Sequence, residues 1–200
     1  FEAIKRFVER RKPSDVKVKV LRLDRNYGFA GGVNRGYAVR NPDSKYVALL
    51  NNDAVPYPDS LGRMIEVLEA YESLGAVQGI VVRYSDPNRV DTAGGFLTEL
   101  LTSHLAFSGS NPRSVKHGFY VTYADGSYSV YRVEALRRAL GWSDRLFHDY
   151  AFAYLDDVYL GLKLWGAGFR VASIPVVAAR HARGSTFGRT GPALYLGVRA

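Results

Sequence analysis

Segments that fit short β-strands alternate along this chain with segments whose apolar residues recur at helical spacing. Strand patterns occupy residues 16–23, 45–50, 76–82, 128–132 and 169–174, and helix patterns occupy 1–12, 31–40, 58–74, 133–140 and 156–165. Such alternation is typical of an α/β domain with a mainly parallel sheet and helices on both faces. We predict this fold for all 200 residues, as a single domain.

Composition narrows the classes of function. The chain has no cysteine, which excludes a disulfide framework and thiolate metal sites and fits a cytoplasmic protein or one at the inner membrane face. No apolar run approaches the roughly 20 residues that span a bilayer. The net charge of +8 fits either a solvated basic surface or an anionic partner such as a membrane that the protein binds peripherally. Nucleic acid is not an expected partner, because no aromatic–basic recognition motif accompanies the charge.

Polar clusters follow the predicted strands where an open α/β sheet places its ligands. Asn51, Asn52 and Asp53 come directly after the apolar strand 45–50. Carboxylate and amide oxygens suit Mg²⁺ or Mn²⁺, which would bridge a diphosphate. The alternative is a turn in which these side chains satisfy their own backbone.

Two adjacent acids, Asp156 and Asp157, begin a predicted helix. One carboxylate can cap the helix while the other faces a cleft and acts as a general base. Both can equally be ordinary acids of a first helical turn. His181 follows the last strand pattern and is either a metal ligand or a buried, hydrogen-bonded histidine.

A glycine-rich segment, residues 28–36, precedes a predicted helix. Its backbone N–H groups can approach a phosphate or base, although close packing of helix on strand explains the glycines equally well. The spacing is G-x-x-G-G-x-x-x-G, which differs from the dinucleotide fingerprint and lacks the lysine of a P-loop. Residues 83–118 are polar and read as a variable excursion on the substrate side.

Together these segments resemble a family 2 glycosyltransferase of the rhamnosyltransferase-like branch. The resemblance rests on N-Y-G-F-A-G-G-V-N-R-G at 26–36, V-A-L-L-N-N-D-A-V-P-Y-P-D at 47–59, and L-D-D-V-Y-L at 155–160 with the later Gly168, Pro175 and His181. The order and spacing of these motifs over residues 26–181 make it specific. Asp156 and Tyr159 depart from the family's E-D-x-D-L pattern.

The resemblance implies a GT-A type nucleotide-diphospho-sugar transferase fold, an inverting reaction and a divalent metal. It implies that Asp53 and His181 bind the metal and that Asp157, with Asp156 beside it, is catalytic. By the same resemblance, the nucleotide sugar binds at a set of residues early in the chain: Asn26, Gly31, Gly32, Asn34, Asn52 and Asp53. It also implies that an N-terminal strand–helix–strand, which would hold the nucleobase, is missing.

We expect a glycosyltransferase that moves a sugar from a nucleotide-diphosphate donor to a glycan or lipid-linked acceptor in polysaccharide or glycolipid assembly. Two alternatives remain open. One is a nucleotidyltransferase on a similar sheet, and the other is a non-catalytic, degenerate binding module.

Overall fold

The computed structural model describes residues 1–141, 143–148 and 155–182. The helices of this part of the chain are α1 (Glu2–Arg11), α2 (Gly28–Ala38), α3 (Ser60–Ala70), α4 (Val133–Ala139), α5 (Asp156–Gly166) and the short 3₁₀ helix η1 (Pro112–Ser114). The strands are β1 (Tyr46–Leu50), β2 (Ala54–Pro56), β3 (Leu74–Arg83), β4 (Val90–Thr92), β5 (Gly95–Leu97), β6 (Ser103–Leu105), β7 (Phe119–Val121), β8 (Tyr128–Arg132) and β9 (Arg170–His181). No described helix has the length and apolar character needed to cross a membrane.

Seven strands form one sheet in the order β1-β8-β3-β9-β2, with β4 added beside β3 and β7 beside β9, while β5 and β6 form a separate pair. The sheet is mixed, not mainly parallel as predicted: β3 and β9 are parallel, but β8 is antiparallel to both β1 and β3. The segment before β8 contains no helical crossover, so β8 enters in the opposite direction. β1, β3 and β9 therefore point the same way.

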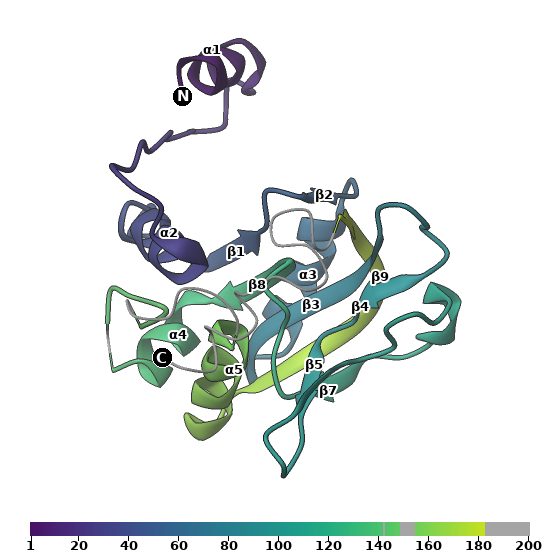
Figure 1. The fold of residues 1–200 in the computed structure, drawn as a ribbon. Helices are drawn as coiled ribbons and strands as arrows, with labels where there is room; N and C mark the ends of the chain where they lie inside the picture. Colours follow the sequence, from purple (N-terminus) through teal and green to yellow (C-terminus); the bar gives the residue numbers. More distant parts are fainter. Residues whose placement is uncertain (142, 149–154, 183–200) are drawn as a thin grey trace.

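Helices cover both faces of this sheet, as predicted (Figure 1). Alternate residues of each strand face opposite sides: in β3, Ala76 packs into a core cluster with α2, α4 and α5, whereas Val77 packs into a second cluster with Met64 and Leu68 of α3. The sheet is therefore buried on both faces, between α3 on one face and α2, α4 and α5 on the other.

Strand β9 is longer than the sequence indicates. We expected it to end before Pro175, but it continues to His181. The ladder between β3 and β9 jumps from Gln78–Ser173 to Ile80–Val177, so Pro175 lies in an irregularity where its missing N–H costs no ladder hydrogen bond. This continuation carries His181 to the edge of the sheet where β1 also ends.

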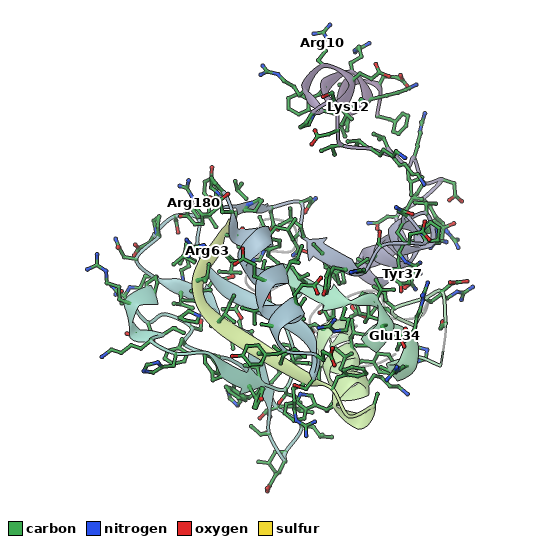
Figure 2. All side chains as sticks on the ribbon, turned by 180° about the vertical axis from the view of Figure 1, so that it is seen from behind. Arg10, Lys12, Tyr37, Arg63, Glu134 and Arg180 are labelled. Atoms are coloured by element: carbon green, nitrogen blue, oxygen red, sulfur yellow. The ribbon has the colours of Figure 1, made fainter. Side chains whose placement is uncertain are left out.

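The predicted strand at 16–23 is wrong. Residues 16–23 have no ladder partner among the described residues and are largely exposed, because an alternating pattern forms a strand only where another strand offers its backbone. Helix α1 precedes this segment, has no buried residue and stands apart from the sheet (Figure 1). Arg10 and Lys12 project from it, far from Arg63 and Arg180 on the α3 side (Figure 2).

The 83–118 segment is more ordered than a variable excursion. It contains β4, β5, β6 and η1. Val90, Ala93, Ala106 and Val115 are buried in a third core cluster with Ile80 and Val82 of β3. This packing fixes β4 against the carboxyl-terminal half of β3.

Candidate active site

Asp53 and His181 lie side by side. β2 pairs antiparallel with the end of β9, so Ala54 stands opposite His181, and the Ala182 N–H donates to the Asp53 carbonyl at 2.9 Å. This register brings Asp53 Oδ1 to 3.0 Å from His181 Nε2. The His181 side chain is 5% exposed and that of Asp53 20% exposed, so the carboxylate is the part of the pair that solvent reaches.

A third residue, Asp91 of β4, lies on the other side of the His181 ring. Its Oδ2 lies 2.8 Å from His181 Nδ1, and its side chain is only 6% exposed. His181 is thus a buried histidine with a carboxylate within hydrogen-bond distance of each ring nitrogen. This position is compatible with both alternatives drawn from the sequence. Asp91 was not among the residues we predicted.

The turn Asp125–Gly126–Ser127 joins the other polar clusters. The Ser127 carbonyl accepts from the Asn51 N–H at 3.1 Å, directly after β1. The Gly126 N–H donates to Asp157 Oδ2 at 3.4 Å, and the Asp125 N–H donates to Gln78 Oε1 at 2.6 Å. One turn therefore connects the end of β1, the centre of β3 and the first turn of α5.

Asp157 and Asp156 have different surroundings. Asp157 is half-buried, and its Oδ1 accepts from the Val158 N–H at 2.9 Å. Burial, followed by repulsion from the Asp125 carboxylate, raises the pKa of Asp157 to about 7 despite the Val158 and Gly126 N–H groups. Asp156 is 5% exposed, and burial raises its pKa to about 6. Neither side chain caps α5, whose N-cap is Leu155.

A carboxyl with a pKa near 7 is suited to act as a general base at neutral pH, because both of its protonation states are populated there. Asp157 has this property and retains partial access to solvent. Asp156 does not share that access. Of the two predicted catalytic acids, the geometry therefore favours Asp157 as the proton acceptor.

The predicted nucleotide-binding residues of α2 divide into two groups. Asn34 is 5% exposed; its Nδ2 donates to the Phe147 carbonyl at 2.8 Å and its Oδ1 accepts from Leu146 and Phe147 N–H groups. These bonds tie α2 to the 146–147 segment, a positioning role that the sequence did not indicate.

Asn26, Gly31 and Gly32 lie at the start of α2. Asn26 Oδ1 accepts from the Gly28 N–H at 2.9 Å in a local turn. A Cβ at Gly31 would lie 2.7 Å from Tyr27 Cβ, so tight packing explains this glycine, whereas a Cβ at Gly32 would meet nothing within 4 Å. The space beside Gly32 is open to a ligand or to solvent.

The Asp53–His181 pair fits a divalent cation. A carboxylate oxygen suits Mg²⁺ or Mn²⁺, and an imidazole nitrogen is a common metal ligand; Asp53 Oδ1 and His181 Nε2 lie 3.0 Å apart, a hydrogen-bond distance. Within residues 1–141, 143–148 and 155–182, no group of three or more His, Cys, Asp or Glu side chains is arranged to hold a metal. Two protein ligands suit a cation that is held jointly with a substrate diphosphate. Asn52 is exposed beside the pair.

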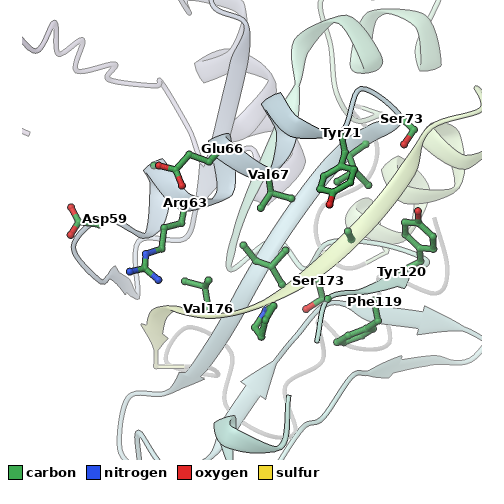
Figure 3. A pocket seen from close by; sticks show the side chains of 16 residues that line it. Asp59, Arg63, Glu66, Val67, Tyr71, Ser73, Phe119, Tyr120, Ser173 and Val176 are labelled. Carbon is green, nitrogen blue, oxygen red and sulfur yellow. The ribbon is translucent and has the colours of Figure 1, made fainter. Parts of the chain in front are cut away.

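A groove of about 1170 Å³ lies elsewhere, between α3 and strands β7 and β9 (Figure 3). Arg63, Glu66, Tyr71, Tyr120 and Ser173 line it, among others. None of the predicted site residues does. Because the clustered carboxylates and His181 carry the chemistry, we place the candidate active site at the ends of β1 and β9 and not in this groove.

Comparison with known proteins identifies the family and the fold. Residues 2–191 match the family described as "Glycosyltransferase like family 2". The chain belongs to this family. The chain is also similar in fold to a crystal structure of GalNAc-T7 with UDP, GalNAc and Mn²⁺, with a TM-score of 0.70 and 15% identity over 100% of this chain and 39% of the other. The predicted GT-A type fold is confirmed, whereas the rhamnosyltransferase-like branch stays a prediction.

Proposed function

We propose that this glycosyltransferase transfers a sugar from a nucleotide-diphosphate donor to an acceptor hydroxyl in one displacement that inverts the anomeric carbon. The observation that carries the proposal is Asp157, a half-buried carboxylate with a raised pKa at the rim of the turn that joins the polar clusters. The match to the family supports the class of reaction.

Asp157 has the role of general base. The acceptor O–H proton passes to Asp157 as the acceptor oxygen forms a bond to the anomeric carbon, and the bond from that carbon to the phosphate oxygen breaks, releasing the nucleoside diphosphate. Hydrogen bonds from the Gly126 and Val158 N–H groups orient the carboxylate. Burial and, second to it, the charge of Asp125 raise the pKa of Asp157 to about 7, so this carboxylate can accept a proton near neutrality.

Asp53 and His181 are the residues that would hold Mg²⁺ or Mn²⁺ together with the donor. Such an ion, when bound, offsets the negative charge that builds on the leaving diphosphate. The similar GalNAc-T7 structure contains UDP and Mn²⁺, which supports the choice of a divalent cation and a nucleoside diphosphate. The exposed Asn52 and the open space beside Gly32 are the proposed contacts to the nucleotide sugar.

The acceptor that we propose is a glycan or a lipid-linked glycan at the inner face of a membrane. The net charge of +8 supports an anionic acceptor or surface. This part of the proposal concerns the substrate class and does not affect the assignment of the base.

The substitution Asp157→Asn tests the proposal. We expect kcat to fall about 10²–10⁴-fold, the usual contribution of a general base, while the affinity for UDP with Mn²⁺, measured by calorimetry, stays the same. Asp43→Asn, which changes an exposed acid far from the turn, is the matched control. Full activity of Asp157→Asn would remove the base assignment.

Two assays separate the alternatives. Release of pyrophosphate from a nucleoside triphosphate would indicate a nucleotidyltransferase. Failure to bind any nucleoside diphosphate with Mn²⁺, combined with salt-sensitive binding to RNA or DNA, would indicate a non-catalytic module.

A further inference from the structure

We propose that Asp91 is a positioning residue that orients His181 and fixes its tautomer so that Nε2 faces Asp53 and the divalent cation. The inference rests on the proposed function, because it assigns a residue to the same metal site. It differs from that proposal in its subject: Asp91 does not touch the ion or the substrate but acts through the imidazole ring.

A local irregularity in the pairing of β4 with β3 places the Asp91 side chain next to His181. The ladder between β3 and β4 steps from Val81–Thr92 to Val82–Val90, so Asp91 is the extra residue of a β-bulge. Bulges commonly re-aim a side chain beside an active site. Val82 and Val90 are fully buried in the core cluster around the bulge, so the strand that presents Asp91 is rigidly packed.

The proton positions follow from the two contacts of the imidazole. An ionised carboxylate only accepts hydrogen bonds, so the 2.8 Å contact of Asp91 with Nδ1 requires a proton on Nδ1. In the neutral ring, Nε2 then carries a lone pair and faces Asp53 Oδ1 at 3.0 Å. Two acceptors at this distance repel each other unless a proton or a cation lies between them. Asp91 thus prepares Nε2 as a ligand.

This arrangement matches a general feature of metal sites. A histidine that binds a metal usually donates its other N–H to a carboxylate or carbonyl, which fixes the ring and makes the ligating nitrogen more basic. Loss of such a partner typically weakens metal affinity about 10–100-fold. The Asp91 side chain is 6% exposed, and burial of a carboxylate is costly without a partner of this kind.

In the first experiment, Mn²⁺ is titrated into the protein in the presence of saturating UDP, and calorimetry measures the binding affinity. We expect Asp91→Asn to bind Mn²⁺ about 10–100-fold more weakly than wild type, because an asparagine can also donate to Nδ1 and thereby stabilise the wrong tautomer. Asp86→Asn, which removes an exposed acid five residues earlier in the chain, is the control and should match wild type. Equal affinity of Asp91→Asn and wild type would overturn the proposal.

The second experiment needs no variant of Asp91 and so does not depend on its folding. Nitrogen-15 NMR of wild type with UDP and Mg²⁺ reports which ring nitrogen of His181 carries the proton. The protein has 4 histidines, and the signals missing from His181→Gln identify the ring. We expect a proton on Nδ1 and none on Nε2; a proton on Nε2 with Nδ1 bare would overturn the inference.

The two proposals can fail separately. If wild type binds Mn²⁺ and Asp53→Ala weakens this binding but Asp91→Asn does not, the metal site stands and the role of Asp91 is wrong. If wild type binds no Mn²⁺ with UDP, the metal site of the proposed function fails. The tautomer of His181 at alkaline pH then still decides whether Asp91 orients the ring.

Discussion

The buried carboxyl group of Asp156 lowers the stability of the folded protein when it is ionised. It is 5% exposed, and its Oδ2 has no hydrogen-bond partner among the described residues. Its neighbour Asp157 instead accepts from two backbone N–H groups. A buried acid that is poorly solvated is stable mainly in its protonated form, which is why burial raises the pKa of Asp156 to about 6.

Replacing Asp156 by asparagine should therefore stabilise the fold at neutral pH. The folded-state pKa of about 6 is above the ordinary value of 3.8, so the aspartate costs stability above about pH 6 and costs none below 3.8. We expect Asp156→Asn to raise the free energy of unfolding by about 1–3 kcal/mol at pH 7. Urea unfolding should show this gain shrinking between pH 6 and 3.8, and a gain that persists at lower pH would contradict the assignment to ionisation.

Asp125 should control the pH dependence of the reaction through Asp157. Because the base must be ionised to accept a proton, kcat/KM should rise with pH through the Asp157 pKa of about 7. The acidic groups whose charges raise the pKa of Asp157 are Asp125 and Asp156. The Asp157 charge in turn helps to raise the pKa of Tyr131 of β8. Asp125→Asn removes the stronger repulsion, so the rising limb should move to lower pH.

The measurement for this prediction is a pH–rate profile of wild type, Asp125→Asn and the exposed control Asp43→Asn. The rising limb of the Asp43→Asn profile should lie at the same pH as that of wild type. A limb that moves to higher pH in Asp125→Asn, or one that does not move, would show that the Asp125 charge does not act on the base.

The sequence nominates part of the candidate site, and these site residues stay a prediction. Asp53, Asp157 and His181 stand out because each follows or begins a strand or helix with a clear pattern. Asp91 and Asp125 were missed, because their roles depend on a bulge in β4 and on the pairing of β8 with β1, which are contacts between distant segments. An acid between β-branched residues, as in Val90-Asp91-Thr92, was the available signal.

At the scale of elements, the sequence patterns predicted β8 and α5, missed the strands of three residues and added one strand that does not form. β8 was predicted with its observed bounds, and α5 within one residue. The strands β4 to β7 have three residues each and show no usable period. Residues 16–23 alternate well but have no ladder partner in the part of the chain that the structure describes. Strand β9 continues past Pro175 because the ladder is irregular there.

The close approach of β9 to β3 at their irregular pairing leads to a prediction about stability. A Cβ at Gly79 would lie 2.5 Å from Ala178 Cβ and 2.8 Å from the Val176 carbonyl oxygen. Because the backbone must shift to relieve this contact, Gly79→Ala should destabilise the fold by about 1–3 kcal/mol. Gly62→Ala is the matched control: a Cβ there meets nothing within 4 Å on helix α3, so this variant should gain up to about 1 kcal/mol.

Chemical denaturation of the two glycine variants measures both effects in one experiment. The predicted order of stability is Gly62→Ala, wild type, Gly79→Ala. If Gly79→Ala were as stable as wild type, β9 would not approach β3 as closely as the structure places it, and the path of the strand to His181 would need revision.

At the scale of the whole molecule, the mixed sheet collects residues from five segments at one edge. β1, β3 and β9 run in the same direction, so Asn51–Asp53 and His181 follow the ends of two strands that point to that edge. Strand β4, which lies beside β3, places Asp91 next to His181. The turn before β8 links this edge to α5. A ligand that binds there holds together elements from residue 51 to residue 181, and it should therefore stabilise the entire fold.

Thermal unfolding should report this coupling. A ligand at about 100 times its Kd adds about 2.7 kcal/mol to the stability of the folded state, and each kcal/mol raises the Tm of a domain of 150–250 residues by about 2–4 °C. We expect saturating UDP with Mn²⁺ to raise the Tm by about 5–10 °C, and EDTA to abolish most of this shift. GDP and dTDP serve as comparisons for the nucleobase. Asp53→Ala should lose the shift, whereas Asp157→Asn should keep it, because Asp53 is a proposed ligand of the ion and Asp157 is not. Equal shifts in the two variants would contradict that division of roles.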